Sequence, residues 1–287
     1  MGRCALQRYP DTELNVEVHE SVRGRDVYII QPTSPPVDQH LMELLFLADA
    51  CRRAGAVRVT GVVPYFGYAR QDRRARGREA LGARLIADFV RSSGIERIIA
   101  VDLPTASLEG FFGIPLEHIT AVPLLAQAVS PLLSADSVIL APDLGAVKLA
   151  ERCSEFLQAP IAVVHKVRVS SEEVQVRGIV SDVRGRCAVV IDDMITTGGT
   201  IEAAVKAFIA QGGLRDIVVV ATHGLLVGHA DKRIRVLPLR GCFVTDSVEI
   251  PKNLSLHIEV VSLAPLFAEA IRRLHENRSM SDLIAHR

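Results

Sequence analysis

The sequence predicts an α/β fold with parallel β-sheets flanked by helices. Three observations favour this class: short β-branched runs recur along nearly the whole chain, helix-period segments separate them, and the runs are continuously apolar. Continuously apolar strands are typical of parallel sheets that helices cover on both faces. The predicted strands are Val27–Ile30, Val57–Val63, Arg97–Val101, Val138–Ala141, Ile161–Val164, Ala188–Ile191 and Ile217–Ala221.

The segments between these strands carry the periodicity of helices. In Thr200–Gln211, apolar residues recur at i, i+3, i+4, i+7 and i+8 from Ile201, which places them on one helix face. The tail Leu266–Arg287 has the pattern of an amphipathic helix with a polar end. The other predicted helices are Gln39–Ala54, Ala80–Ser93 and Pro123–Leu133.

A repeated order of predicted elements divides the chain into two related halves. A strand, a polar loop, a helix, a turn with glycine and a second strand occur from Val27 to Val63 and again from Ala188 to Ala221. We therefore expect two α/β domains, residues 1–117 and residues 118–287. The second domain includes the C-terminal helix in this division.

Composition excludes several classes of protein. Lys and Arg together number 33, as do Asp and Glu, so no bulk positive field favours nucleic acid. The five cysteines are scattered and never in C-x-x-C spacing, which argues against a disulfide framework or a zinc site. The chain has no apolar stretch of about 18 residues, and its N-terminus lacks the apolar region of a signal peptide. We expect a cytoplasmic protein with no membrane or nucleic-acid partner.

The strongest motif joins a predicted strand to a predicted helix. Asp192 and Asp193 come at the strand's carboxyl end, where open α/β sheets bind ligands, and adjacent carboxylates accept hydrogen bonds from neighbouring sugar hydroxyls. The residues that follow offer hydroxyls and backbone N–H groups at a helix N-terminus, a phosphate-binding arrangement. An acidic turn before a helix N-cap is the simpler alternative, but the complete pattern is far rarer. The candidate ribose 5-phosphate-binding residues are Asp192, Asp193, Thr196, Thr197, Gly198, Gly199 and Thr200.

This motif resembles the phosphoribosyl diphosphate loop shared by type I phosphoribosyltransferases and ribose-phosphate pyrophosphokinases. From about Arg8 to Leu283 the chain is similar to the second family, most closely in Val63–Arg74, Gly24–Gln31 and His40–Leu45. The resemblance implies two tandem type I phosphoribosyltransferase-like domains with the active site between them. The first would carry the ATP-binding segments and lack the family's first strand and helix; the second would carry the ribose-phosphate loop.

The resemblance also implies roles for residues in the first half. Arg70 and Gln71 match the positions that hold ATP; an arginine can stack on a base or bind phosphate, and a glutamine can donate or accept. On composition alone, the arginines around Arg70 could instead form a solvated basic loop. Asp11, Thr12 and Glu13 fall on the segment that reaches the ATP of a neighbouring subunit, a role that rests on the resemblance alone.

Two cations in the second half match the family's catalytic lysine and its partner arginine on a mobile loop. These are Lys166 and Arg168, and Arg168 is also a candidate for binding ribose 5-phosphate. Diphosphoryl transfer needs positive charge around a transition state whose oxygens carry the negative charge. The alternative is an exposed strand edge with two cations.

The candidate metal ligands for Mg²⁺ are Asp143 and Asp102. Asp143 falls on a magnesium-associated position of the family, and carboxylate oxygens suit this ion. Asp102 begins a segment where the family commonly reads Asp-Leu-His but this chain has Pro104, which cannot donate to a metal. Either Asp102 with water completes the metal shell, or the nucleotide mainly holds the ion. A second departure is Thr196, where many members carry a third aspartate.

The resemblance implies a ribose-phosphate diphosphokinase that serves nucleotide biosynthesis. It would convert ATP and D-ribose 5-phosphate to 5-phospho-α-D-ribose 1-diphosphate and AMP, with Mg²⁺, in a homo-oligomer that is a hexamer or its dimer unit. A phosphoribosyltransferase would also explain the Asp192 loop but leaves Tyr65–Arg74 without a role. A catalytically silent regulatory subunit is the other alternative, favoured by Pro104 and the late start of the chain and opposed by Lys166 and Arg168.

Overall fold

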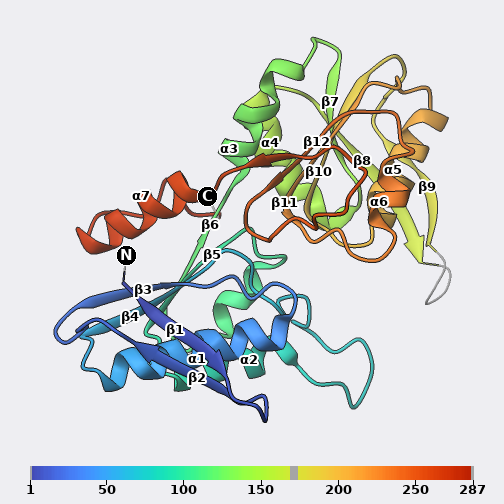
Figure 1. Ribbon diagram of the computed structural model, residues 1–287. Helices are drawn as coiled ribbons and strands as arrows, with labels where there is room; N and C mark the ends of the chain where they lie inside the picture. The colour runs from blue at the N-terminus through green and yellow to red at the C-terminus, as the bar shows by residue number, and fades with distance from the viewer. Residues whose placement is uncertain (1, 169–173, 286–287) are drawn as a thin grey trace. The chain divides into compact units, whose positions relative to one another are not determined.

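The chain folds into two compact units in the computed structural model, which describes residues 2–168 and 174–285, without the side chains of residues 166–177. The first unit comprises Met1–Thr120 and Ala264–Arg287, and the second comprises Ala121–Leu263 (Figure 1). None of the helices described is long and apolar enough to cross a membrane. Each unit contains a parallel sheet with helices against it, so the predicted α/β class is confirmed.

The first unit is built on a four-stranded parallel sheet in the order β3-β4-β5-β6. Two amphipathic helices bury their apolar faces against this sheet in one core cluster. The strands are β3 (Asp26–Ile30), β4 (Arg58–Val63), β5 (Arg97–Val101) and β6 (Leu116–Ile119), and the helices are α1 (Val37–Arg53) and α2 (Gly82–Ser92), with the short 3₁₀ helix η1 (Ala106–Gly110) before β6.

A β-hairpin precedes this sheet. Strands β1 (Cys4–Arg8) and β2 (Leu14–Val18) pair antiparallel, and Val16 and Val18 pack against the core of the first unit. The sequence analysis did not predict this hairpin, because most of its residues stay partly or fully exposed and its strands lack a continuous apolar run. Its turn carries Asp11, Thr12 and Glu13.

The second unit contains a seven-stranded sheet in the order β13-β12-β11-β10-β7-β8-β9, parallel except for β9. Alternate residues of the central strands pack on α5, while the intervening residues face the side where α3 and α4 lie (Figure 1). Helices therefore cover both faces. The elements are α3 (Val122–Val129), η2 (Ser130–Leu132), β7 (Ser137–Ala141), η3 (Leu144–Ala146), α4 (Val147–Leu157), β8 (Ile161–Arg168), β9 (Val174–Val180), β10 (Cys187–Ile195), α5 (Gly199–Ala210), β11 (Ile217–Gly224), α6 (Ala230–Ile234), β12 (Leu239–Thr245) and β13 (Glu259–Val261).

The C-terminal helix α7 (Ala264–His275) belongs to the first unit, whereas the sequence analysis assigned it to the second domain. The segment after α7 explains the difference, because it pairs with the edge strand β6: Ile284 bridges Ile119, and the N–H of Thr120 donates to the carbonyl of Leu283 at 3.0 Å. The N-terminal stretch of the first unit ends at Thr120, three residues beyond the predicted boundary at 117.

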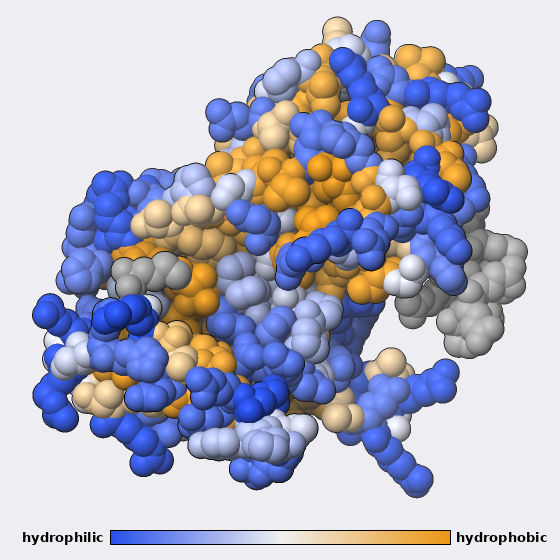
Figure 2. All heavy atoms as spheres, viewed as in Figure 1, coloured by the Kyte–Doolittle hydropathy of each residue, from blue (hydrophilic) through white to orange (hydrophobic). Residues whose placement is uncertain are grey.

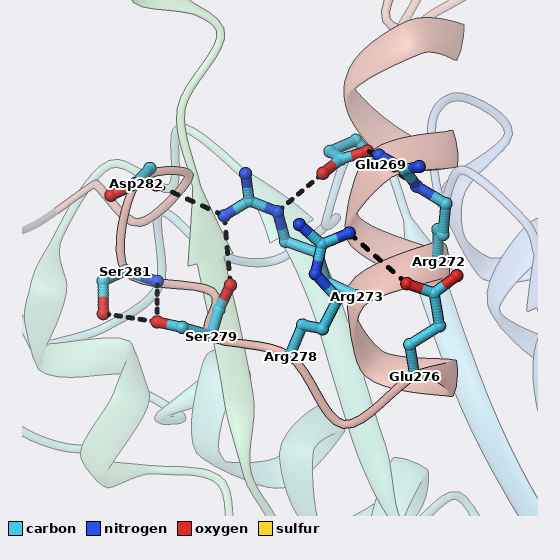
Figure 3. Close-up of polar contacts among 8 residues, drawn as sticks. All are labelled: Glu269, Arg272, Arg273, Glu276, Arg278, Ser279, Ser281 and Asp282. Atoms are coloured by element: carbon cyan, nitrogen blue, oxygen red, sulfur yellow. Dashed lines mark hydrogen bonds and ion pairs between the residues drawn. The ribbon is translucent and has the colours of Figure 1, made fainter.

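A small polar network fixes the turn that follows α7 (Figure 3). The guanidinium of Arg273 donates to Glu269 at 2.7 Å and to the carbonyl of Ser279 at 3.0 Å, and it lies 3.6 Å from a carboxylate oxygen of Asp282. Glu269 also pairs with Arg272, and these two arginines hold the pKa of the Glu269 carboxyl below its usual range. The turn is thus fastened to the helix before the chain reaches β6.

Candidate functional site

The predicted ribose-phosphate loop lies at the carboxyl edge of the second unit's sheet. Strand β10 continues to Ile195, so Asp192 and Asp193 lie near its carboxyl end. Asp192 lies opposite Ala221 of β11. Helix α5 begins at Gly199. Gly198 caps the helix with φ +75°, a left-handed conformation that glycine adopts without steric cost. The strand, loop and helix follow one another as the sequence predicted.

The carboxylates at this edge affect one another. Burial raises the pKa of Asp192 well above its usual range, and the negative charges of Asp193 and Asp143 raise it further. Asp143 follows β7, the strand that pairs with β10, and its Oδ1 accepts the N–H of Gly145 at 2.9 Å. The structure therefore brings together Asp143 and the Asp192–Asp193 pair, which the sequence placed on separate strands.

The predicted ATP-binding segment follows β4 in the first unit. Thr33 anchors it: its N–H and its hydroxyl both donate to the carbonyl of Tyr65, at 2.8 and 3.0 Å, and its Oγ1 accepts the N–H of Gly67 at 2.6 Å. Phe66 is buried and meets the ring of Phe112 edge-on at 5.3 Å.

Beyond this anchored turn the chain returns to the surface at the two candidate ATP ligands. Arg70 and Gln71 are both exposed, and the backbone of Gln71 is held by hydrogen bonds to Tyr68 and Ala83. A buried aromatic turn thus presents an exposed cation and an exposed amide. The surrounding arginines are also exposed, as the solvated-loop alternative requires, so exposure alone does not decide between the two interpretations.

The other candidate ATP ligands, Asp11, Thr12 and Glu13, form the exposed tip of the β1–β2 hairpin. Thr12 has φ +77°, its N–H donates to the carbonyl of Tyr9 at 2.8 Å, and Asp11 Oδ1 accepts the N–H of Glu13 at 3.1 Å. The turn therefore has a defined shape and displays two carboxylates on the surface.

Asp102 lies in a strained turn at the end of β5. It is buried, with φ +40°, and its N–H donates to the carbonyl of Ile119 at 3.0 Å. The next N–H, that of Leu103, donates to Nε2 of the buried His118 at 2.8 Å. A non-glycine residue with positive φ persists only where its surroundings fix it, and these two bonds do so. Asp102 and Asp143 belong to different units.

Lys166 and Arg168 lie in β8, where the backbone of Lys166 pairs with Val176 of β9. Their side chains lie outside the part of the chain that the structure describes. The assignment of these two residues stays a prediction from the sequence.

Sequence reasoning missed a buried polar cluster beside the ribose-phosphate loop. His223 in β11 lies opposite Met194 of β10, and its Nδ1 is 2.9 Å from the Oγ of Ser247. The hydroxyls of Ser247 and Thr245 both donate to the carbonyl of Thr222, at 3.2 and 2.6 Å. A histidine two residues after a predicted strand was the available signal.

Comparison with known proteins identifies the family. The family described as the N-terminal domain of ribose phosphate pyrophosphokinase matches residues 1–94, and the phosphoribosyl synthetase-associated domain matches residues 171–285. A ribose-phosphate pyrophosphokinase from Staphylococcus saprophyticus is 42% identical over 287 residues, which cover 99% of this chain and 89% of that relative. The chain belongs to the ribose-phosphate pyrophosphokinase family.

Other members of the ribose-phosphate pyrophosphokinase family agree. The ribose-phosphate pyrophosphokinase of Bacillus subtilis is 40% identical over 286 residues, covering 99% of this chain and 90% of that relative. The crystal structure of phosphoribosylpyrophosphate synthetase from Mycobacterium smegmatis matches with a TM-score of 0.88 and 36% identity, covering 96% of this chain and 91% of that one. The predicted family and its fold are therefore confirmed.

Proposed function

We propose that the protein is a ribose-phosphate diphosphokinase, which transfers the diphosphoryl group of ATP to ribose 5-phosphate. The observation that carries the proposal is the loop from Asp192 to Thr200, with paired carboxylates at the end of a parallel strand and a helix N-terminus directly after it. It occurs in a chain about 40% identical to named ribose-phosphate pyrophosphokinases over nearly its full length.

Ribose 5-phosphate would bind along this loop. Asp192 and Asp193 would accept hydrogen bonds from the ribose hydroxyls, and Thr196–Thr200 would hold the 5-phosphate with hydroxyls and backbone N–H groups. The positive end of the α5 dipole favours an anion there.

ATP would bind through the first unit. Arg70 would contact the base or the phosphates, and Gln71 would hydrogen-bond the nucleotide, because both side chains are exposed beyond the turn that Thr33 anchors. Asp11, Thr12 and Glu13 of a neighbouring copy would complete the adenine site from the tip of the hairpin. Nucleotide biosynthesis is the process that the product would serve.

The transfer joins two substrates with all atoms accounted for. The C1 hydroxyl oxygen of the ribose forms a bond to the β-phosphorus of ATP and releases its proton, while the β-phosphorus loses its bond to the α–β bridging oxygen. AMP leaves with that oxygen. Lys166 and Arg168 would stabilise the negative charge on the transferring group, and Arg168 would also contact ribose 5-phosphate.

The carboxylates fit Mg²⁺, which prefers one or two carboxylates together with substrate phosphates and water. Asp143 and Asp102 would hold the ion, and the raised pKa of Asp192 marks an edge where a cation would relieve repulsion between carboxylates. No group of three or more metal-ligating side chains is found among the described residues. When bound, Mg²⁺ would neutralise the charge of the ATP phosphates.

A homo-oligomer, either a hexamer or its dimer unit, is part of the proposal. Polar residues cover much of the visible surface, but apolar patches are exposed in both units (Figure 2). Met42 and Phe46 are exposed one helical turn apart on α1, and Leu85 and Phe89 are exposed at the same spacing on α2. Such stripes on two helices support contact with further copies of the chain.

The test is formation of AMP from ATP, Mg²⁺ and ribose 5-phosphate, followed by chromatography of the nucleotides. We expect AMP and the phosphoribosyl diphosphate in equal amounts, and no AMP when ribose 5-phosphate is omitted. A folded protein that produces no AMP but raises the activity of an active pyrophosphokinase would make it a regulatory subunit. Release of diphosphate from added phosphoribosyl diphosphate, only when a nucleobase is also present, would make it a phosphoribosyltransferase.

A further inference from the structure

Three consecutive carbonyls of the loop between β10 and α5 accept hydrogen bonds from one downstream segment, residues 226–233. Two of the donors are backbone N–H groups, and the third is a side chain. The segment therefore lies along one side of the loop over its whole turn. The pairs are the N–H of Leu226 with the carbonyl of Ile195 at 3.0 Å, the N–H of Val227 with that of Thr196 at 2.9 Å, and Nη1 of Arg233 with that of Thr197 at 3.2 Å.

The glycines of the loop meet helix α6 on this same side. A Cβ at Gly198 would lie 3.0 Å from Cγ1 of Ile234 and 3.5 Å from Cα of Ala230. A Cβ at Gly199 would lie 3.1 Å from Nη1 of Arg233. A side chain at Gly198 would therefore crowd Ile234 of α6, and one at Gly199 would press on the end of the Arg233 side chain.

The hydrogen bonds that these loop carbonyls accept determine where the loop's N–H groups point. In a planar trans peptide the carbonyl of one residue and the N–H of the next point in opposite directions. Because the carbonyls of Thr196 and Thr197 face the segment 226–233, the N–H groups of Thr197 and Gly198 face away from it. The proposed 5-phosphate would therefore lie on the side of the loop away from segment 226–233.

We propose that α6 is the support of the ribose-phosphate loop and that Arg233 is its positioning residue. This inference rests on the proposed function, since it deepens the role of the same loop. Arg233 fixes the peptide plane between Thr197 and Gly198, and so aims the N–H of Gly198, directly before α5, toward the 5-phosphate.

The charge of Arg233 adds a second effect. Its Nε lies 3.7 Å from a carboxylate oxygen of Glu202, which stands in the first turn of α5 and also pairs with Lys206 at 2.6 Å. A carboxylate there repels a bound phosphate unless cations offset it. Removing Arg233 therefore loosens the loop and leaves Glu202 less neutralised.

The experiment compares Arg233→Ala with Arg235→Ala, an exposed arginine two residues further on. We expect Arg233→Ala to weaken ribose 5-phosphate binding, measured by titration calorimetry, and to raise the KM for ribose 5-phosphate about tenfold. A tenfold change corresponds to the loss of about one hydrogen bond from a charged donor. The KM for ATP should stay within about twofold. Arg235→Ala should change neither. Unchanged ribose 5-phosphate affinity in Arg233→Ala, or an equal rise in both KM values, overturns the proposal.

Two further variants separate the causes. Arg233→Gln keeps an N–H donor for Thr197 but loses the charge, so it should fall between the native protein and Arg233→Ala. Adding Glu202→Gln to Arg233→Ala should recover part of the affinity, because the uncovered carboxylate is gone. If Arg233→Gln binds ribose 5-phosphate as weakly as Arg233→Ala, and Glu202→Gln recovers none of the affinity, Arg233 acts only on overall stability.

A readout without substrate distinguishes failure of this inference from failure of the proposed function. In hydrogen exchange of the ligand-free protein, Arg233→Ala should speed exchange in peptides that cover residues 196–203 several-fold, and leave β7 unchanged. Unchanged exchange there overturns the support role even if AMP is formed. Faster exchange in a protein that forms no AMP keeps the support role and removes the proposed function.

Discussion

At the scale of single residues, Asp192 is proposed to bind ribose 5-phosphate but lowers the stability of the ligand-free protein. Its folded-state pKa lies above the unfolded value, so the folded chain holds the proton to higher pH than the unfolded chain does. Stability is therefore greatest below the unfolded value, near 3.8, and falls as pH rises through the folded pKa. At neutral pH Asp192 therefore lowers the stability of the ligand-free protein.

Asp192→Asn should accordingly stabilise the ligand-free protein at neutral pH, because it removes the carboxyl group whose ionisation burial and the neighbouring carboxylates disfavour. The amide oxygen can still accept the N–H of Asp193, as the carboxylate does at 3.0 Å. Thermal unfolding with a chelator present would show this, and calorimetry should show weaker ribose 5-phosphate binding. The stability difference should vanish near pH 3; a difference that persists there would have another cause.

Lys166→Ala tests the predicted catalytic lysine. Its charge should matter mainly in the transition state, so we expect turnover to fall about 10²-fold or more while ATP affinity stays within several-fold. Steady-state kinetics of AMP formation, together with nucleotide titration, measure both. Turnover within a factor of three of the native protein would remove Lys166 from the catalytic machinery.

The candidate residues differ in how far sequence could find them. Asp192 to Thr200 were accessible because the whole loop is contiguous, and its strand and helix flank it directly. Arg233 reaches the same loop from α6, which is only a five-residue helix without a periodic signal. His223 lies opposite Met194 of β10 and bonds Ser247. The roles of Arg70, Gln71 and Lys166 remain predictions from resemblance to the family.

At the scale of elements, prediction succeeded where burial is continuous. All seven predicted strands are present. Six of them lie inside their sheets, where parallel strands are apolar on both faces, and the exception is the edge strand β3. Strand β12 was missed, since Arg240 and Gly241 interrupt its apolar run. Helix α4 buries only two small residues, Ala150 and Cys153, so its apolar stripe is weak. Elements that lie at edges or bury little surface leave little pattern.

The turn after α5 offers a test of packing. A Cβ at Gly213 would lie 2.3, 2.5 and 2.6 Å from three ring carbons of Phe208, which is fully buried. Gly213→Ala should therefore lower the free energy of unfolding by about 1–3 kcal/mol, the usual cost of overpacking. Thermal or denaturant unfolding would measure it, with Gly110→Ala as the control, because no atom lies within 4 Å of a Cβ there.

A double mutant isolates the cause. Phe208→Leu removes the ring that Gly213 faces, so it should cost less in the Gly213→Ala background than in the native protein. Equal costs in the two backgrounds would mean that the clash with Phe208 is not what destabilises Gly213→Ala.

At the scale of the whole molecule, chain order and spatial order differ. The first unit is completed by the last residues of the chain, which return after the whole second unit has been formed. No local pattern predicts this, because an amphipathic helix needs an apolar surface and its sequence does not say which one. The pairing of Ile284 with Ile119 supplies the choice, and the chain carries no motif for such an edge contact.

Truncation of the tail tests what this pairing does. A chain that ends after Glu276 keeps α7 but loses the bridge to β6 and two backbone hydrogen bonds, from Thr120 to Leu283 at 3.0 Å and from Ala285 to His118 at 2.8 Å. At about 1 kcal/mol for each hydrogen bond, plus the loss of the Ile284 side chain, the first unit should lose roughly 2–4 kcal/mol. It should also expose the free edge of β6, which other chains can pair with.

Hydrogen exchange followed by mass spectrometry separates this local effect from general instability. In the chain ending after Glu276, peptides that cover β6 should exchange at least tenfold faster, while those that cover β11 in the second unit keep their native rates. A chain ending after Ala285 is the matched control, because it retains every tail residue of the described part of the chain that bonds to β6. The assignment of the tail to the first unit predicts native exchange in this control. Equal acceleration of β6 and β11 in the shorter chain would instead mean that the tail stabilises both units alike, and native rates in β6 would mean that its pairing with Ile284 contributes nothing to holding the edge.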